Sequence, residues 1–209
     1  IILLDHPAPH VARLTLNRPK ARNAINAAMA ETIERLVGEI EADREIRVGI
    51  VAGNGPSFCA GADLREVAAG RGPALMTATA GFAGFVYGSR NKPWIAAVHG
   101  AAHAGGAEIA LACDMIVAGE EASFGLPEVR RGVIPGAGGA FRITRVLPRP
   151  LALELVTTGA TIDARRAYEI GLINRLVPTA QVPDEAVAMA SAIAGNSPMA
   201  VREVLQLTR

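Results

Sequence analysis

The chain has 209 residues, of which half are hydrophobic and a fifth are charged, and this composition suits one domain with a sizeable core. The net charge of +1 excludes a bulk electrostatic attraction to nucleic acid or to an anionic membrane. No apolar run reaches the roughly 18 residues that a membrane span needs. Neither nucleic acid nor a membrane is therefore expected as a partner.

The two cysteines, Cys59 and Cys113, lie far apart among small or apolar neighbours. No CxxC pair and no His/Cys cluster accompanies them, so the sequence predicts buried thiols and no metal site. The chain opens at Ile1 in a strand-like segment rather than at a methionine. The expectation is a cytoplasmic protein whose true N-terminus precedes this sequence.

Strands and helices alternate along the whole chain, which predicts an α/β fold. In the first helix, six apolar residues fall on one face: Ile25, Met29, Ile33, Leu36, Val37 and Ile40. The patterns predict, in chain order, a strand over 11–17, a helix over 23–41, a strand over 47–53, a helix that starts near Asp63, a helix over 75–90, a strand over 92–100, a helix over 105–114, two short strands within 114–125, a loop with short helical pieces over 126–147, helices over 150–159 and 163–171, a strand over 172–178 and a helical remainder.

The glycine-rich turns do not carry a nucleotide-binding motif. GAGGAF, residues 136–141, begins like G-x-G-x-x-G, but Phe141 occupies the place of the last glycine and no clear strand precedes it. No G-K-[ST] follows a glycine loop, and G-x-S-x-G is absent. The sequence therefore argues against a dinucleotide fold, a P-loop and a nucleophile elbow.

Two strand–loop–helix junctions share a different pattern, VAGNGPSFCAGADL and AAVHGAAHAGGAEIALA. In each, a loop of small residues leads into a helix N-terminus, where backbone N–H groups lack helical partners. Two such N–H groups meeting in space would bind a developing oxyanion. The alternative, that the small residues only allow tight strand–helix packing, stays open at this point.

Two glutamates near these junctions are candidates for acid–base chemistry. Glu108 lies between Ala107 and Ile109 in an apolar helix, where an ionised carboxylate needs compensation. Glu128 follows Pro127 and precedes two arginines, so a solvated carboxylate is its simpler interpretation. If the two converged beside an oxyanion hole, they would form an acid–base pair.

Several linked blocks of the sequence resemble the enoyl-CoA hydratase (crotonase) family. They are SFCAGADL, KPWIAAVHGAAHAGGAEIALACDMIVAGEEASFGLPEVRRGVIPGAGG and GLINRLVP, and the match extends from LTLNRPKARNAI to the last helix. The resemblance implies a crotonase-like spiral of β-β-α units with C-terminal helices. It also implies an acyl-CoA thioester substrate of lipid metabolism, no cofactor beyond the coenzyme A of that substrate, and a homotrimer or dimer of trimers.

By motif position, the resemblance assigns the amides of an oxyanion hole to Ala62 and Gly105 and the two hydratase glutamates to Glu108 and Glu128. Glu108 would activate a water as general base, and Glu128 would deliver a proton to the α-carbon. The resemblance also implies substrate contacts around Ala60, Ala62, Asp63, Leu64, Arg65 and Gly105, and a place near the nucleotide part for Lys20, Ala21 and Arg22. A solvated turn is an equal alternative for Lys20 and Arg22.

The sequence departs from the family pattern at His103, where an apolar or tyrosyl residue is expected. We interpret His103 as a wall histidine with a satisfied hydrogen bond, the alternative being a role in shaping the acyl pocket. Residues 1–190 are expected to form the crotonase-like core, and 191–209 the start of a C-terminal helical region that appears truncated. Hydration is the favoured reaction; double-bond isomerisation by Glu128 alone, another crotonase-type lyase reaction, or non-catalytic binding of acyl-CoA or RNA are the alternatives.

Overall fold

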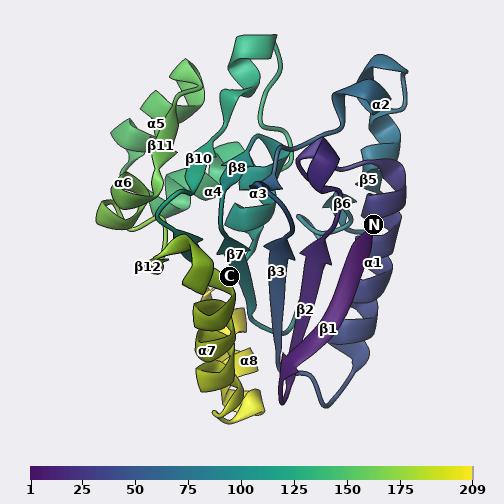
Figure 1. Cartoon of the computed structure of the whole chain (residues 1–209), viewed down its shortest axis with the longest axis vertical. Coiled ribbons are helices and arrows are strands. Elements are labelled where there is room, and N and C mark those ends of the chain that lie inside the picture. Colours follow the sequence, from purple (N-terminus) through teal and green to yellow (C-terminus); the bar gives the residue numbers. More distant parts are fainter. Residues whose placement is uncertain (209) are drawn as a thin grey trace.

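Two sheets form the centre of the molecule in the computed structural model, which describes residues 1–208 (Figure 1). The larger sheet has the order β1-β2-β3-β7-β9-β12 and is parallel except for the β1–β2 hairpin. The smaller sheet has the order β11-β10-β8-β4. The large-sheet strands are β1 Ile2–Ala8, β2 Val11–Leu16, β3 Val48–Gly53, β7 Trp94–Val98, β9 Met115–Gly119 and β12 Arg175–Val177; the others are β4 Ser57–Cys59, β8 Ala101–His103, β10 Ser123–Gly125 and β11 Thr161–Asp163.

From β3 to β10, each strand of the large sheet is followed by a strand of the small sheet, and this alternation makes the spiral. β3 lies in the large sheet and β4 in the small one; the pairs β7–β8 and β9–β10 repeat the arrangement. The connecting and covering helices are α1 Ala27–Ala42, α2 Leu64–Ala68, α3 Gly105–Ala112, α4 Gly139–Val146, α5 Arg149–Thr158, α6 Ala164–Glu169, α7 Val182–Ala194 and α8 Pro198–Thr208, with short 3-10 turns η1 Pro19–Ala21, η2 Gly72–Leu75, η3 Pro127–Arg131 and η4 Thr179–Gln181. The predicted α/β class and β-β-α spiral are confirmed.

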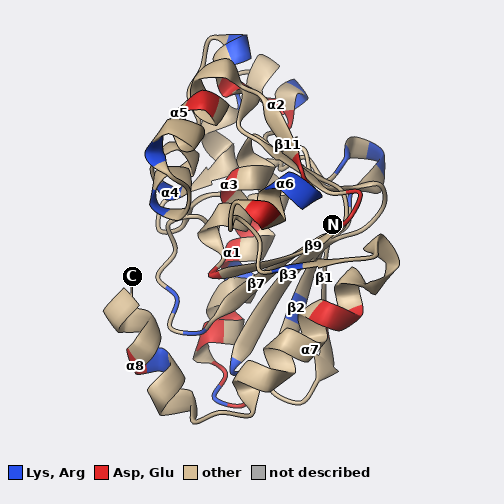
Figure 2. Ribbon diagram, turned by 90° about the vertical axis from the view of Figure 1, so that its left-hand side faces the viewer, with Lys and Arg blue, Asp and Glu red and all other residues tan. Residues whose placement is uncertain are grey.

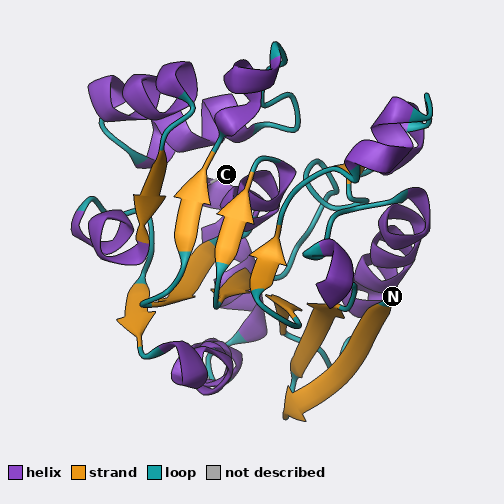
Figure 3. Cartoon of the chain, turned by 45° about the horizontal axis from the view of Figure 1, so that its top comes forward, coloured by secondary structure: helices purple, strands orange, loops and turns teal. Residues whose placement is uncertain are grey.

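The central strands of the large sheet are buried on both faces, with helices on either side (Figure 3). Side chains alternate between the two faces along β7: Trp94, Ala96 and Val98 pack in the core that contains α1, whereas Ile95 and Ala97 pack in the core that contains α7. A parallel strand buried on both faces needs the continuous apolar run that this segment carries. Cys59 and Cys113 are both buried free thiols, as predicted.

The first helix begins later than the sequence predicted, at Ala27 rather than Asn23. Asn26 caps α1, because its side chain accepts a hydrogen bond from the Met29 N–H at 3.0 Å. Asn23 is fully buried with a φ of 55°, and its side-chain amide donates to the carbonyls of Asn54, Ser57 and Phe58. A residue that joins two loops in this left-handed conformation cannot start a helix.

The predicted helix over 75–90 is wrong. This segment contains the two-residue strands β5 Met76–Thr77 and β6 Gly81–Phe82, followed by turns. Gly81, Ala83 and Gly84 have φ values of 68°, 59° and 62°, outside the right-handed helical region. A Cβ on Gly84 would lie 2.2 Å from the Ala30 carbonyl oxygen, so the chain here packs its backbone directly onto α1.

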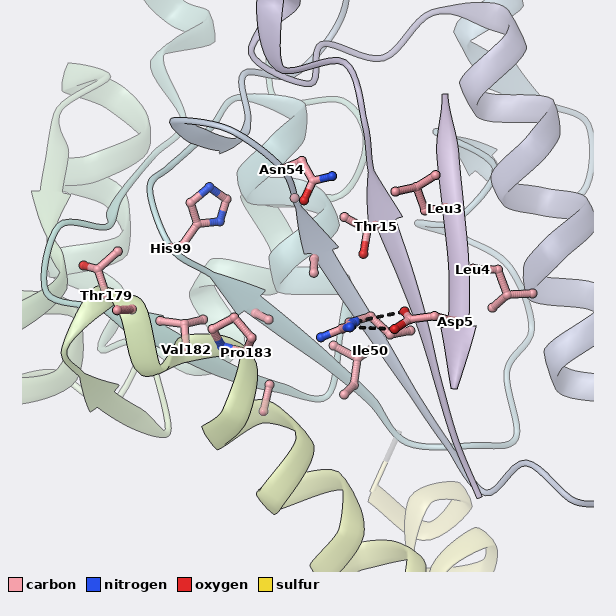
Figure 4. A pocket seen from close by; sticks show the side chains of 16 residues that line it. Leu3, Leu4, Asp5, Thr15, Ile50, Asn54, His99, Thr179, Val182 and Pro183 are labelled. Carbon is pink, nitrogen blue, oxygen red and sulfur yellow. Dashed lines mark hydrogen bonds and ion pairs between the residues drawn. The ribbon is translucent and has the colours of Figure 1, made fainter. Parts of the chain in front are cut away.

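A cavity of about 660 Å³ lies on the face of the large sheet that α7 leaves open (Figure 4). An ion pair between Arg13 and Asp5 crosses its floor, and the imidazole of His99 is held by the Gly55 carbonyl at 2.7 Å. The strand ends of both junctions line this cavity, through Ala52, Gly53, Asn54, Ala97 and His99, but neither helix N-terminus reaches this cavity. It therefore supplies no oxyanion site.

The charged residues are scattered over the fold, with acidic and basic positions mixed along the ribbon (Figure 2). Within residues 1–208, no helix is both long enough and apolar enough to span a bilayer.

We predict that Gly106→Ala destabilises the fold, because the added Cβ would lie 2.0 Å from the Cys59 carbonyl oxygen. The expected loss in the free energy of unfolding is on the order of 3 kcal/mol. The matched control is Gly38→Ala in α1, where an added Cβ meets nothing within 4 Å. That variant should gain roughly 0.5–1 kcal/mol from helix propensity. Urea unfolding of both measures the difference, and equal stabilities would contradict the packing argument.

Candidate active site

Two backbone turns come into contact where the two junctions of small residues end. One turn follows β4 and contains Gly61; the other follows β8 and leads into α3 at Gly105. A Cβ on Gly61, whose φ is 95°, would lie 2.9 Å from the Gly105 nitrogen. The missing side chain therefore allows the two turns to meet.

The contact leaves two backbone N–H groups free. Ile25 bridges this turn by donating to the Gly61 carbonyl at 2.8 Å and accepting from the Asp63 N–H at 2.9 Å, which skips the N–H of Ala62. Ala104, with a φ of 51°, turns the chain so that Gly105 becomes the first residue of α3. Within residues 1–208, the N–H groups of Ala62 and Gly105 donate no hydrogen bond. Two free donors on adjacent turns suit an oxyanion.

A cavity of about 690 Å³ lies beside these turns and is lined by both glutamates. Its rim is apolar, and several large side chains on it are exposed: Leu64, Val67, Met76, Val133 and Ile134. The other lining residues are Ala60, Ala62, Phe82, Ala104, Gly105, Glu108, Pro127, Glu128, Arg130, Arg131, Gly136 and Ala137. One cavity thus contains the predicted oxyanion residues and the predicted acid–base pair.

Glu108 lies in the first turn of α3, and only 4% of its surface is exposed. Its Oε1 accepts a hydrogen bond from the Gly139 N–H at 2.9 Å. A Cβ on Gly139 would lie 2.9 Å from Glu108 Cγ, so this contact needs a glycine. Burial raises the pKa of Glu108 to about 7, and repulsion from Glu128 contributes to this rise. The hydrogen bond from Gly139 acts in the opposite direction and lowers the pKa.

Glu128 lies in η3, and its side chain lines the same cavity as Glu108. Burial raises the pKa of its carboxyl group. Within residues 1–208, its buried Oε2 has no hydrogen-bond partner. An unpartnered carboxyl oxygen that faces a cavity is free to bind a water or a substrate atom. The simpler interpretation from the sequence, a solvated carboxylate, does not describe this environment.

The residues predicted to contact coenzyme A divide into two groups. Ala60 and Leu64 line the cavity, beside Ala62 and Gly105. The structure places the others outside its lining: Asp63, Arg65, Lys20, Ala21 and Arg22.

Asp63 has a structural role at the start of α2, where the sequence predicted that a helix begins. Its side chain caps α2 by accepting from the Arg65 N–H at 3.1 Å, and it pairs with Arg18 at 3.0 Å. Burial raises the pKa of Asp63, but the Arg18 guanidinium and the Arg65 N–H outweigh it and hold the pKa below its ordinary value. The η1 turn with Lys20 adjoins this region, since the Arg22 carbonyl accepts from the Ala60 N–H at 3.0 Å.

Sequence reasoning missed three residues at the centre of the site. A Cβ on Gly105 would lie 2.4 Å from the ring of Phe82, so this ring packs directly under the oxyanion turn. Ala137 and Gly139 form the turn that holds Glu108. The GAGG run gave a signal for the turn, but a test for nucleotide binding could not reveal a contact with a glutamate.

The hydrogen bond of His103 is satisfied, as interpreted from the sequence, but the residue does not form part of the cavity wall. Its Nε2 lies 3.0 Å from the Ser123 hydroxyl, and burial lowers its pKa. Because the cavity lining does not include His103, the alternative role in the acyl pocket gains no support. Across residues 1–208, no cluster of three or more metal-ligating side chains occurs.

Comparison with known proteins assigns the family. The sequence model of a family described as enoyl-CoA hydratase/isomerase matches residues 8–208. The chain belongs to this family. It is similar to the mevalonyl-coenzyme A hydratase of Aspergillus fumigatus, with 41% identity over 98% of this chain and 76% of the relative. It is also similar to the 2,3-dehydroadipyl-CoA hydratase of Escherichia coli, with 42% identity over 95% of this chain and 78% of the relative.

Solved structures of the enoyl-CoA hydratase/isomerase family share the fold. The enoyl-CoA hydratase of Mycobacterium tuberculosis superposes with a TM-score of 0.94 at 40% identity, over 99% of this chain and 81% of that one. The carnitinyl-CoA hydratase of Mycobacterium avium superposes with a TM-score of 0.92 at 43% identity, over 99% and 80%. The family resemblance of the sequence and the crotonase fold are both confirmed.

The raised pKa of Glu108 predicts a stability that depends on pH. The folded chain keeps a proton up to about pH 7 that an ordinary carboxyl group releases near 4.5. The free energy of unfolding therefore contains a contribution that is complete below about pH 4.5 and is lost as the pH rises through 7. Glu108→Gln carries no charge at any pH, so its unfolding free energy does not contain this contribution. Relative to the parent, its unfolding free energy should therefore rise by roughly 2 kcal/mol when the pH is raised from 5 to 8.

Chemical unfolding of both proteins at the two pH values measures this change. The exposed Glu120→Gln is the control, and its difference from the parent should stay within about 0.5 kcal/mol at both pH values. A Glu108→Gln difference that does not vary with pH would show that Glu108 titrates as an ordinary surface carboxylate.

Proposed function

We propose that this protein is an enoyl-CoA hydratase, which adds water reversibly to a 2-enoyl-CoA and gives a 3-hydroxyacyl-CoA. One observation carries the proposal: Glu108, Glu128 and the residues with free N–H groups, Ala62 and Gly105, line the same cavity. Membership of the enoyl-CoA hydratase/isomerase family supports it. Coenzyme A enters as part of the substrate, and the proposed reaction uses no other cofactor.

The two free N–H groups provide the electrophilic half of the reaction. The thioester carbonyl oxygen accepts hydrogen bonds from Ala62 and Gly105, which draws electrons from the conjugated double bond toward that oxygen. The β-carbon becomes electrophilic, and the enolate that forms as water adds is stabilised by the same two donors. Because the donors are backbone groups held by the meeting of two turns, they need no reorganisation during the reaction.

The two glutamates provide the proton transfers. Glu108 takes a proton from the water as it attacks the β-carbon, and Glu128 delivers a proton to the α-carbon. Burial raises both pKa values, and repulsion from Glu128 adds to the rise at Glu108, which favours a pair that holds one proton between its members near neutral pH. A carboxylate and a carboxylic acid are then present together, as the reaction requires in either direction.

The apolar rim supports an acyl chain beside the glutamates. Val67, Met76, Val133 and Ile134 expose large hydrophobic side chains around the cavity. We place the coenzyme A portion along the Ala60 to Arg65 segment, with Lys20, Ala21 and Arg22 near its nucleotide end. Exposed apolar side chains gathered at one cavity mark a binding site more readily than scattered ones do.

Assembly and domain organisation are proposed from the family resemblance alone. We propose a homotrimer or a dimer of trimers, with a crotonase-like core over residues 1–190 and a C-terminal helical region that begins at 191. α8 has no buried residue within the chain, and its exposed apolar side chains include Met199, Val204 and Leu207. Such a helix is compatible with a further partner surface.

The Gly105 N–H can be tested with two variants that share one steric effect. Any Cβ at this position meets the Phe82 ring, so Gly105→Ala measures the clash while keeping the N–H. Gly105→Pro adds the loss of the donor, at a first helical position that tolerates proline. We expect kcat for hydration to be lower in the proline variant than in the alanine variant by about 10²–10³-fold. Equal kcat values in two folded variants would remove the Gly105 N–H from the mechanism.

The two glutamates should respond differently to substitution. Glu108→Gln keeps a side chain that can hold a water but cannot take its proton, so hydration should fall by roughly 10²–10⁴-fold. It should retain part of the exchange of α-protons with deuterated solvent, because Glu128 is intact. Glu128→Gln should lose both activities. The double variant should be little worse than the worse single variant, since the pair acts as a unit.

Enoyl absorbance and deuterium incorporation, measured on folded variants, give these rates. Hydration near the parent rate in both single variants would refute the glutamate-pair mechanism. Impairment of Glu128→Gln alone would favour double-bond isomerisation by that residue. A folded parent without turnover on a panel of enoyl-CoA substrates would point to an acyl-CoA-binding protein, and binding of an oligonucleotide that weakens as salt rises would point to RNA.

A further inference from the structure

Arg142 joins two chain segments behind the glutamate pair. It lies on α4, one turn after Gly139, and its side chain is half-buried. Nη1 donates to the Ala137 carbonyl at 3.0 Å, and Nη2 donates to the Val86 carbonyl. A Cβ on Gly138 would lie 2.1 Å from Nη1, so the guanidinium occupies the space that a side chain there would fill. Both ends of this bridge depend on the planar fork of an arginine.

Tyr87 adds a second link between the same two segments. Its hydroxyl group donates to the Gly136 carbonyl at 3.0 Å, and the Arg142 guanidinium lies 5.4 Å from its ring centre. The 136–139 turn is therefore fastened at two carbonyls to the segment that contains Val86 and Tyr87. The Gly139 N–H at the end of this turn is the donor to Glu108.

The segment that Arg142 and Tyr87 hold also touches the oxyanion turn. Phe82 lies four residues before Val86, and its ring packs where a Gly105 side chain would be. The Val86 N–H donates to the Phe82 carbonyl at 3.3 Å, which closes a tight turn between them. One short segment thus supports Gly105 on one side and the turn that orients Glu108 on the other.

We propose that Arg142 is a positioning residue for hydration, which acts by holding the 136–139 turn against the 82–87 segment so that Glu108 and the oxyanion hole keep their relative placement. The proposal rests on the hydratase function proposed above. Arg142 does not line the cavity, so it acts through Glu108 and not on the substrate. A misplacement of about 1 Å in such a constellation costs on the order of 10²-fold in rate.

The charge of Arg142 gives this role a signature that simple packing lacks. The strongest charge interactions of the Glu108 carboxyl are with Glu128 of η3, which raises its pKa, and with Arg142 of α4, which lowers it. The other titratable groups on the elements packed against α3 are Arg145 on α4, His103 on β8 and Cys59 on β4, with Cys113 at the C-terminal end of α3 itself. Removal of the Arg142 charge should raise the pKa of Glu108 further.

Four variants separate the bridge from the charge. Arg142→Gln removes both the bridge and the charge. Arg142→Lys keeps the charge, but an ammonium group cannot span the Ala137 and Val86 carbonyls. Tyr87→Phe removes only the hydrogen bond to the Gly136 carbonyl. The matched control is Arg145→Gln, an exposed arginine one turn further along the same helix. We expect kcat to fall about 10–100-fold in Arg142→Gln with KM within about threefold, less in Arg142→Lys and Tyr87→Phe, and to stay within about twofold in Arg145→Gln.

The pH dependence distinguishes positioning from structural support. The acidic limb of the kcat profile reports ionisation of the base, so it should move to higher pH in Arg142→Gln and stay in place in Arg142→Lys and Tyr87→Phe. A second readout does not need turnover: the titration of Glu108 followed by NMR of ¹³C-carboxyl-labelled glutamate, with Glu108→Gln assigning the signal. It should show the same shift in the pKa of Glu108.

Two results would overturn the proposal. One is a folded Arg142→Gln protein with the kcat and acidic limb of the parent. The other is an equal loss in Arg142→Gln and Arg142→Lys with an unshifted limb and an unshifted Glu108 titration, which would reduce Arg142 to general packing. A parent that does not hydrate enoyl-CoA, while the Glu108 titration still depends on Arg142, would refute the hydratase function and leave the charge interaction between Arg142 and Glu108 in place.

Discussion

The contact between the turns at Gly61 and Gly105 is the constraint on which the site depends. Both turns end a strand of the small sheet, and β4 pairs directly with β8, so the sheet brings the turns to the same edge. Neither turn could approach the other with a side chain at Gly61. Because backbone amides that enter a helix lack helical partners, close approach of two such turns places two donors together without any polar side chain. Because strands of the two sheets alternate in the spiral, the turns that follow β4 and β8 both lie at one edge of the small sheet.

The same packing makes Glu108 costly to the fold. α3 packs against β4 so closely that Gly106 has no room for a methyl group, and the carboxyl group of Glu108, two residues further along, has almost no access to solvent. A buried carboxylate would be strongly destabilising, so the group keeps its proton up to about pH 7. The hydrogen bond from Gly139 recovers part of this cost by stabilising the charged form. Glu108 therefore destabilises the fold at a buried helix position where an apolar side chain such as leucine would not.

The sequence predicted the architecture well, because strand and helix patterns here are strong and the family blocks are long. The α/β class and the apolar setting of Glu108 follow from residues whose pattern is local, and the spiral follows from the family resemblance, whereas the burial of Glu128 was not predicted. The predicted 75–90 helix failed because Gly84 approaches the Ala30 carbonyl, a contact with a residue far away in the chain. The helix start at Asn23 failed for a similar reason, since three distant carbonyls hold its side chain. Contacts of Glu108 with Gly139 and of Phe82 with Gly105 have no local signal either.

The balance of charge around the cavity fits the proposed sharing of one proton by the glutamate pair. Two carboxylates facing one partly dry cavity repel each other, and a nearby cation would normally ionise both. Arg142 is the cation that most affects Glu108, yet its guanidinium donates to the Ala137 and Val86 carbonyls and does not pair with either carboxylate. Its charge therefore moderates the pKa of Glu108 without fixing the ionised state. A direct salt bridge would hold the pair fully ionised, and no proton would remain for the α-carbon. Because Arg142 donates to backbone carbonyls instead, one glutamate of the proposed pair can stay protonated while the other is ionised.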